Sequence, residues 1–279
     1  MTGKLIKYEF RSALRLIAIV WAALLAAAIF LGIILRTMEF VSAEAPRGVF
    51  VFVEMFFSVV PPLLYGALFI AMLVITVLVV VLRFYRGVLG DEGYLMHTLP
   101  VKPWQLITAK GVVASAVILI SGVAAMLSIF MIIGIQDIGG FFKDMGEMFI
   151  WLGNNPKAIL ITLEIIVILV FGVVKSVYQI YAAMAIGQLA GKHRLLASLG
   201  AYIGINMILT VLLLVLMITV DATGMDVWIV DIFEAVAAYN RAFFIGQTAL
   251  GVLFAMTFVQ LAAFHVVTER ILSKKLNLI

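Results

Sequence analysis

The chain has 279 residues, of which 65% are hydrophobic and only 12% are charged, and its mean hydropathy is +1.23. Soluble domains carry about a quarter charged residues, so this composition excludes a soluble enzyme or binding domain and indicates an integral membrane protein. The net charge of +4 is divided among short segments, which argues against a nucleic-acid-binding protein, and the absence of cysteine excludes a disulfide framework or a thiolate metal site.

Six apolar stretches are long enough, at about 20 residues each, to cross the hydrocarbon layer of a bilayer as helices. The first stretch is longer than the apolar core of a signal peptide, so we interpret it as a retained span. No segment between the stretches is long enough for a soluble domain, and we therefore predict one all-α transmembrane domain over residues 1–279. The predicted spans are approximately residues 16–35, 60–82, 111–135, 158–182, 197–220 and 244–266.

The distribution of basic residues predicts the orientation of these spans. If the N-terminus is cytoplasmic, thirteen lysines and arginines fall in the inner segments, five fall in the outer segments, and Lys175 lies within a span. Because cytoplasmic loops carry an excess of lysine and arginine, we expect both termini to be cytoplasmic.

The N-terminal stretch "KLIKYEFRSALR", residues 4–15, separates basic from apolar residues when drawn as a helix. Two interpretations are equally compatible with this pattern. The stretch is either an amphipathic helix that lies in the inner interface or a basic flank of the first span.

A polar, turn-rich segment, "GDEGYLMHTLPVKPWQLITAK", occupies residues 90–110 between the second and third spans. Gly90 and Gly93 permit a tight turn, and Pro100 and Pro103 break the helical geometry. The pattern predicts a short helix, a kink and a second helix that leads into the third span. Apolar side chains shown to the cytosol favour a protein partner, whereas a simple connecting loop is the alternative.

This segment, the N-terminal "KYEFRS" and the six spans together resemble the permease subunits of type-2 ABC exporters, particularly bacterial exporters whose ATPase is a separate polypeptide. In those permeases a cytoplasmic acid-glycine-aromatic-leucine run is followed, a few residues later, by Leu-Pro-Val. The matching residues here are Asp91, Glu92, Gly93, Tyr94 and Leu95, followed by Thr98, Leu99, Pro100 and Val101.

The resemblance implies a multi-pass exporter of the bacterial inner membrane. The 20 phenylalanines and 14 methionines would suit an amphipathic or hydrophobic cargo, such as a peptide, a drug or a lipid, although the same residues are also ordinary lipid-facing and core material. The resemblance also implies an elbow helix at the N-terminus and a second permease copy or a sister permease as partner. ATP and Mg²⁺ would bind to the separate ATPase subunits, and this chain itself would hold no cofactor. The coupling helix that docks on the ATPase would include Asp91, Glu92, Gly93, Tyr94, Leu95, Leu99, Pro100 and Trp104.

The outer segment "DATGMDVWIVDIFEAVAAYNRAFF", residues 221–244, is too apolar for a solvated loop and too charged to span. The resemblance implies re-entrant helices at this place. A helix that lies in the interface, anchored by Trp228 and Tyr239, is the alternative.

The chain shows no sequence pattern for catalysis. Its nearest approach to a phosphate-binding loop, "GQLAGKH" at residues 187–193, has three rather than four residues between its glycines and follows no strand. The glycines of this stretch, Gly187 and Gly191, and the glycine pair Gly200 and Gly204 are better explained by close helix packing. The three histidines lie on different segments, so we predict neither a metal site nor an enzyme.

Two ionisable residues, Glu164 and Lys175, lie inside the fourth apolar run. Eleven residues separate them on one helix face, which places them about 16 Å apart along the axis, too far for a direct ion pair. A charge at membrane depth indicates either a transport pathway or an anchor in the helix packing. A secondary transporter that uses these two residues is therefore the alternative function. The uncharged polar residues Asn206, Gln247 and Gln260 are expected to form hydrogen bonds between helices.

Overall fold

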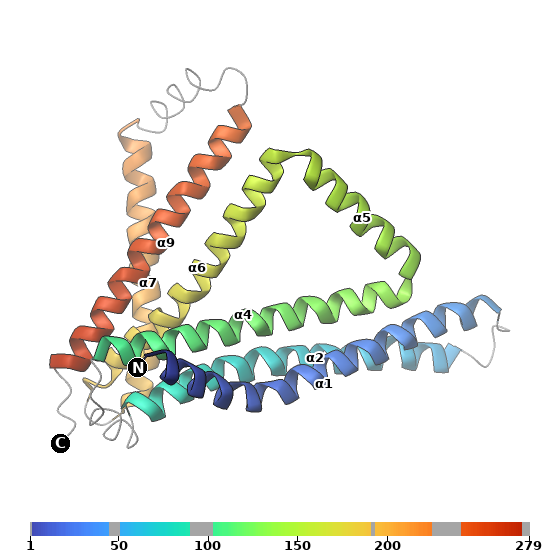
Figure 1. Ribbon diagram of the computed structural model, residues 1–279, viewed down its shortest axis with the longest axis horizontal. Helices are drawn as coiled ribbons and strands as arrows, with labels where there is room; N and C mark the ends of the chain where they lie inside the picture. Colours follow the sequence, from blue (N-terminus) through green and yellow to red (C-terminus); the bar gives the residue numbers. More distant parts are fainter. Residues whose placement is uncertain (1, 45–50, 90–102, 191–192, 225–240, 275–279) are drawn as a thin grey trace. The chain divides into compact units, whose positions relative to one another are not determined.

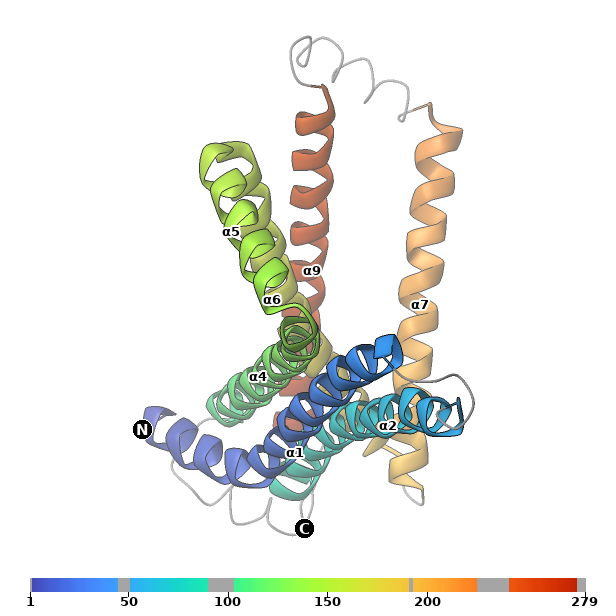
Figure 2. The ribbon, with the colours of Figure 1, turned by 90° about the vertical axis from the view of Figure 1, so that its right-hand side faces the viewer.

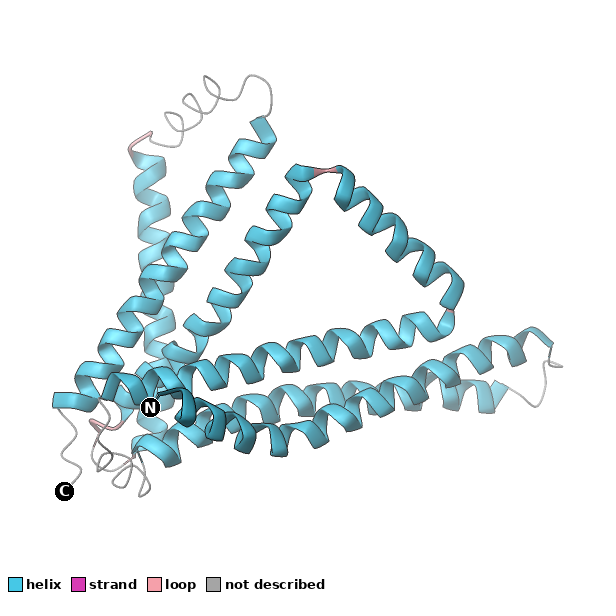
Figure 3. Ribbon diagram, in the orientation of Figure 1, coloured by secondary structure: helices cyan, strands magenta, loops and turns pink. Residues whose placement is uncertain are grey.

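The computed structural model describes residues 2–44, 51–89, 103–190, 193–224 and 241–274, and every regular element within these ranges is helical (Figure 3). The eight helices described are α1 (Thr2–Glu44), α2 (Val51–Phe84), the π-helix η1 (Tyr85–Leu89), α4 (Pro103–Gln136), α5 (Ile138–Asn154), α6 (Pro156–Gly187), α7 (Arg194–Ala222) and α9 (Arg241–Lys274).

Six of these helices contain segments long and apolar enough to span a bilayer. The predicted all-helical membrane protein with six spans is therefore confirmed. The candidate spans are Ile17–Met38, Glu54–Leu89, Trp104–Gln136, Pro156–Gly187, Arg194–Ala222 and Ile245–Ser273.

At the N-terminus the structure shows one continuous helix, α1, rather than a separate elbow helix followed by a span. Figure 2 shows the axis of α1 bending near its N-terminal end. Buried Ala13 and Ile17 pack against Val113 and Val117 of α4, so the region expected to form the elbow continues into the helix packing.

The segment between the third and fourth candidate spans forms a helix, α5, that was not predicted from the sequence. The side chain of Asp137 caps its start by accepting a hydrogen bond from the Gly140 backbone N–H at 3.0 Å. No residue of α5 is buried in the chain. Its apolar side chains, including Phe149 and Trp151, are exposed, as expected for an amphipathic helix that lies at a membrane surface.

The chain divides into two compact units, which we describe separately. Unit 1 comprises residues 1–82 and 112–159, and unit 2 comprises residues 83–111 and 160–279. In unit 1, α1, α2 and α4 pack together, and Figures 1 and 2 both show α1 and α2 side by side. Leu24, Met72 and Ala125, one from each helix, form part of its buried core.

Hydrogen bonds between side chains connect the three helices of unit 1. The Ser121 hydroxyl accepts from Trp21 Nε1 at 3.0 Å and from Thr76 Oγ1 at 3.2 Å, which joins α1, α2 and α4 at one point. The hydroxyls of Tyr65 and Ser128 share a second bond at 2.7 Å between α2 and α4. Small polar residues of this kind are typical of contacts between membrane helices.

In unit 2, α6 and α9 run side by side in the same direction. The ring of Phe171 on α6 lies 5.2 Å from the ring of Phe254 on α9, and further along both helices Tyr178 lies 5.3 Å from His265. The matching order of these two contacts in the sequence establishes the parallel direction.

The turn between α6 and α7 depends on Gly187. A Cβ atom at this position would lie only 2.6 Å from the Cα atom of Ser198, so only glycine fits without displacing the backbone of α7. The predicted packing role of Gly187 is confirmed, whereas Gly191 lies outside the described residues. The packing role of Gly200 and Gly204 stays a prediction, because a Cβ atom at either position would meet no described atom of this chain within 4 Å.

Candidate functional site

Most of the residues expected to contact an ATPase lie outside the described residues. These residues are Asp91, Glu92, Gly93, Tyr94, Leu95, Leu99 and Pro100. Trp228 and Tyr239, the expected anchors of an interfacial helix, are also not among the described residues. Trp104 is described: it belongs to the first turn of α4, its side chain is 41% exposed, and its carbonyl accepts a hydrogen bond from Thr108 Oγ1 at 2.7 Å.

The structure does describe the chain on either side of residues 90–102, and Tyr181 of α6 contacts both flanks, at Phe84 and at Lys110. On one side Phe84, at the end of α2, stacks on the Tyr181 ring with a centroid separation of 3.7 Å. On the other side, the Tyr181 hydroxyl donates a hydrogen bond to the carbonyl of Lys110 on α4 at 3.2 Å. All three residues are buried, so one aromatic side chain holds both flanks.

Two glycines let these flanks approach their neighbours closely. A Cβ atom at Gly111 would lie 2.7 Å from the Tyr178 hydroxyl oxygen, and one at Gly87 would lie 2.6 Å from Lys110 Nζ. Tyr178 also hydrogen-bonds the Thr108 side chain. We refer to the buried residues Phe84, Gly87, Lys110, Gly111, Tyr178 and Tyr181 as the anchoring cluster.

The π-helix η1 forms one border of the undescribed segment. Its last three residues, Gly87, Val88 and Leu89, are buried. Short π-helical insertions often occur at functional sites, because the extra residue per turn reorients the side chains that follow. The chain therefore leaves the second span through a fixed, irregular turn rather than a frayed helix end.

Glu164 and Lys175 are both half-buried on α6. The Oε2 atom of Glu164 is buried and has no hydrogen-bond partner among the described residues. The same is true of the Nε2 atom of Gln247 on α9. Gln247 was expected to form a hydrogen bond between helices, so its unsatisfied amide differs from that prediction. Asn206 also differs, because it donates to the Tyr202 carbonyl of its own helix at 2.8 Å.

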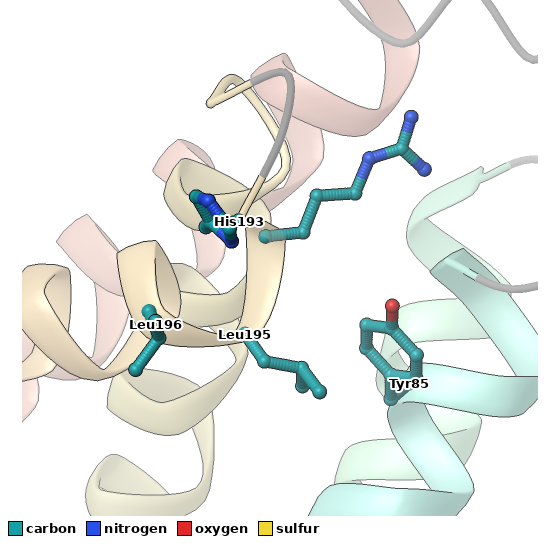
Figure 4. A pocket seen from close by; sticks show the side chains of 5 residues that line it. Tyr85, His193, Leu195 and Leu196 are labelled. Carbon is teal, nitrogen blue, oxygen red and sulfur yellow. The ribbon is translucent and has the colours of Figure 1, made fainter.

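A cavity of about 320 Å³ lies beside the start of α7, lined by Tyr85, His193, Arg194, Leu195 and Leu196. Figure 4 shows Leu195 reaching toward the Tyr85 ring, while His193 and Leu196 project from another side of the same turn. Both leucines are well exposed next to basic residues. This combination suits the boundary between acyl chains and head groups, where apolar and cationic side chains are both solvated.

Within the described ranges, no three histidine, cysteine, aspartate or glutamate side chains are grouped closely enough to hold a metal ion. The features that stand out in unit 2 are therefore the anchoring cluster and the unsatisfied polar atoms between α6 and α9. Sequence reasoning identified Glu164 but missed the anchoring cluster, whose members come from three separate segments of the chain.

The comparisons with known proteins returned no match to this chain, whether from family models, curated proteins or solved structures.

Proposed function

We propose that the chain is the membrane permease subunit of an ATP-driven exporter, located in a bacterial inner membrane with both termini in the cytoplasm. It forms the pathway for an amphipathic or hydrophobic cargo, and separate ATPase subunits bind it through residues 91–104. The loop motif and the charge distribution in the sequence support this proposal. In this interpretation the bent N-terminal part of α1 serves as the elbow, and residues 221–244 correspond to the segment that closes the outer end of the pathway in the exporters that the chain resembles.

The observation that carries the proposal is that Tyr181 contacts both Phe84, before the segment 90–102, and Lys110, after it. A connecting loop needs no such support, because a loop that only joins two spans transmits no force. A segment that receives motion from an ATPase must be held rigidly by the helices that line the pathway. Interiors packed as closely as the anchoring cluster transmit displacement rather than absorb it.

A second copy of the chain fits the proposal because α7 has almost no partner within unit 2. Ser198 is the only buried residue described in this helix. Gly200 and Gly204 form a Gly-x-x-x-Gly pattern, and neither meets a described neighbour. Such pairs let two membrane helices approach closely, so the α7 surface suits a contact between permease subunits.

The proposal is tested by changing the ATPase contact in the affinity-tagged chain, purified from the cells that make it. We expect ATP hydrolysis to co-elute with the unchanged chain, although this chain supplies no nucleotide site. Asp91→Ala combined with Leu95→Ala should remove most of that hydrolysis and stop ATP-dependent transport, because the charged and apolar contacts are both lost. Insertion into the membrane should stay normal.

The matched control is Asp144→Ala with Met148→Ala, which removes an acid and an apolar side chain from the exposed surface of α5. This variant should retain co-eluting hydrolysis and transport. Parental hydrolysis and transport in the Asp91 and Leu95 double variant would show that residues 90–102 are an ordinary connection.

The second candidate function is a secondary transporter, favoured by the buried, unpartnered oxygen of Glu164. A carboxylate at membrane depth is suited to carry a coupling proton or cation. The two functions differ in their energy source, since a protonophore that leaves ATP intact stops a proton-coupled carrier and spares an ATP-driven exporter.

A further inference from the structure

Glu164 Oε2 on α6 and Gln247 Nε2 on α9 are two of the buried polar atoms of unit 2 that have no described partner. Such groups are rare in folded proteins, because a buried donor or acceptor without a partner loses its hydration and gains nothing in return. A buried carboxylate oxygen has the larger penalty of the two.

Glu164 and Gln247 have the same sequence distance from a contact between α6 and α9. Phe171 and Phe254 are in contact, and Glu164 and Gln247 each lie seven residues before one of these rings. Seven residues are within about 20° of two full helical turns, so each polar residue lies on the same helix face as the ring that follows it. Glu164 and Gln247 therefore both lie on the facing sides of α6 and α9, about two turns before the Phe171–Phe254 contact.

The surroundings along this face are aromatic. Beyond the Phe171–Phe254 contact, Phe258 lies 6.4 Å from each of these two rings. Aromatic rings offer apolar area and also attract cations through their electron-rich faces. Lys175 lies on the same face of α6 as Glu164, about 16 Å further along. One end of the face is therefore acidic and the other basic.

We propose that Glu164 and Gln247 bind the ammonium group of an amphipathic cationic cargo. The carboxylate neutralises the ammonium group, the Gln247 amide N–H donates to an acceptor oxygen next to it, and the apolar part of the cargo lies along the three phenylalanine rings. Lys175 repels the cationic end and so sets the direction in which the cargo lies. This inference deepens the proposed function by naming the chemical class of the cargo.

Binding is tested with two fluorescent probes that differ only in charge. One is an N-alkylglycinamide, which carries an ammonium group at pH 7, and the other is the N-alkylpropanamide, in which a methyl group replaces the ammonium group. Fluorescence polarisation measures their binding to the purified full chain in phosphatidylcholine nanodiscs, and empty nanodiscs correct for partition into lipid. We expect the chain to prefer the cationic probe by about tenfold, a typical effect of one specific charge contact.

In Glu164→Gln this preference should fall below about twofold, while the affinity for the neutral probe stays within a factor of about two, because only the charge contact is removed. Gln247→Leu should weaken both probes by the same factor, because both carry the amide oxygen. The control Glu147→Gln, on the exposed surface of α5 where Glu147 lies 3.9 Å from Lys143, should keep the tenfold preference.

Equal binding of the two probes by the unchanged chain, no binding of either, or an unchanged preference in Glu164→Gln would each overturn the inference. Unaltered affinity for the neutral probe shows that the Glu164 variant is folded. The binding assay contains no ATPase, so its outcome is independent of the co-elution test of the proposed function. A charge preference in a chain that recovers no ATPase partner would overturn the proposed exporter function alone. ATP-driven transport without a charge preference would overturn this inference alone.

Discussion

Unit 1 and unit 2 both contain polar side chains within their candidate spans, but the two units differ in whether these side chains have hydrogen-bond partners. In unit 1 the Ser121 hydroxyl accepts from both Trp21 and Thr76, and Tyr65 bonds Ser128, so the polar groups join helices. In unit 2, Glu164 and Gln247 each keep a buried polar atom without a described partner. Satisfied polar contacts rigidify a structure, whereas unsatisfied ones leave capacity for a ligand. This difference favours unit 1 as a scaffold and unit 2 as the unit that binds the cargo proposed above.

The largest effect is expected in unit 2, where α6 meets α7. Gly187→Ala places a methyl group against the backbone of Ser198, and overpacking of this kind costs about 1–3 kcal/mol. We expect a lower Tm of the purified protein, measured by intrinsic fluorescence in detergent. The control is Gly172→Ala in the same helix, where a Cβ atom meets nothing described within 4 Å.

Because alanine is the better helix former, the Gly172→Ala control should raise stability by about 0.5–1 kcal/mol. A glycine-to-alanine substitution in α6 is thus expected to lower the stability at position 187 and to raise it at position 172. A Tm in Gly187→Ala equal to or above that of Gly172→Ala would contradict the close contact between the helices.

An intermediate effect is expected in unit 1. Ser121→Ala leaves the Trp21 indole N–H without its acceptor and removes one partner of Thr76, which should cost about 1–2 kcal/mol. Chemical unfolding followed by tryptophan fluorescence measures this loss. Ser176→Ala is the control. The Ser176 hydroxyl is exposed and donates its described hydrogen bond to the Gly172 carbonyl of the same helix. If both variants lose the same stability, the hydrogen bonds between helices in unit 1 do not stabilise it.

The smallest effect has the opposite sign. Gln247→Leu removes a buried donor that has no described partner, and it should raise the free energy of unfolding by about 1 kcal/mol in the absence of cargo. The same unfolding assay measures it, with the exposed Asn206→Leu as a control expected to change stability very little. A destabilised Gln247→Leu variant would mean that this amide is already satisfied, and the contrast between the units would then disappear.

The six spans could be predicted from the sequence because membrane insertion depends on the sum of side-chain hydropathies over one window. The helix α5 was missed because its 17 residues mix charges with apolar residues, although Asp137 followed by Gly140 and the helical spacing of its apolar residues were visible signals. The position of Glu164 in a span was predicted, and its lack of a partner was not.

Contacts between distant segments had no signal in the sequence. The bond from Tyr181 to Lys110 joins residues 71 apart, and the bond from Trp21 to Ser121 joins residues 100 apart. Helix rotation and register decide such contacts, and hydropathy fixes neither. Gly200 and Gly204 illustrate the limit, because a small-residue pattern predicts a close approach without saying whether the partner belongs to the same chain.

The length of α1 has a consequence for the membranes in which this protein can work. Its 43 residues extend about 65 Å, roughly twice the thickness of the hydrocarbon layer. Hydrophobic mismatch usually sorts proteins by bilayer thickness, since a span that is too short or too long must deform the lipid or tilt. Here the Ala13 and Ile17 contacts with α4 hold the N-terminal part of the helix by protein packing, whatever surrounds it. A change in bilayer thickness would therefore alter how much of α1 is exposed to water, while its N-terminal part stays packed on α4.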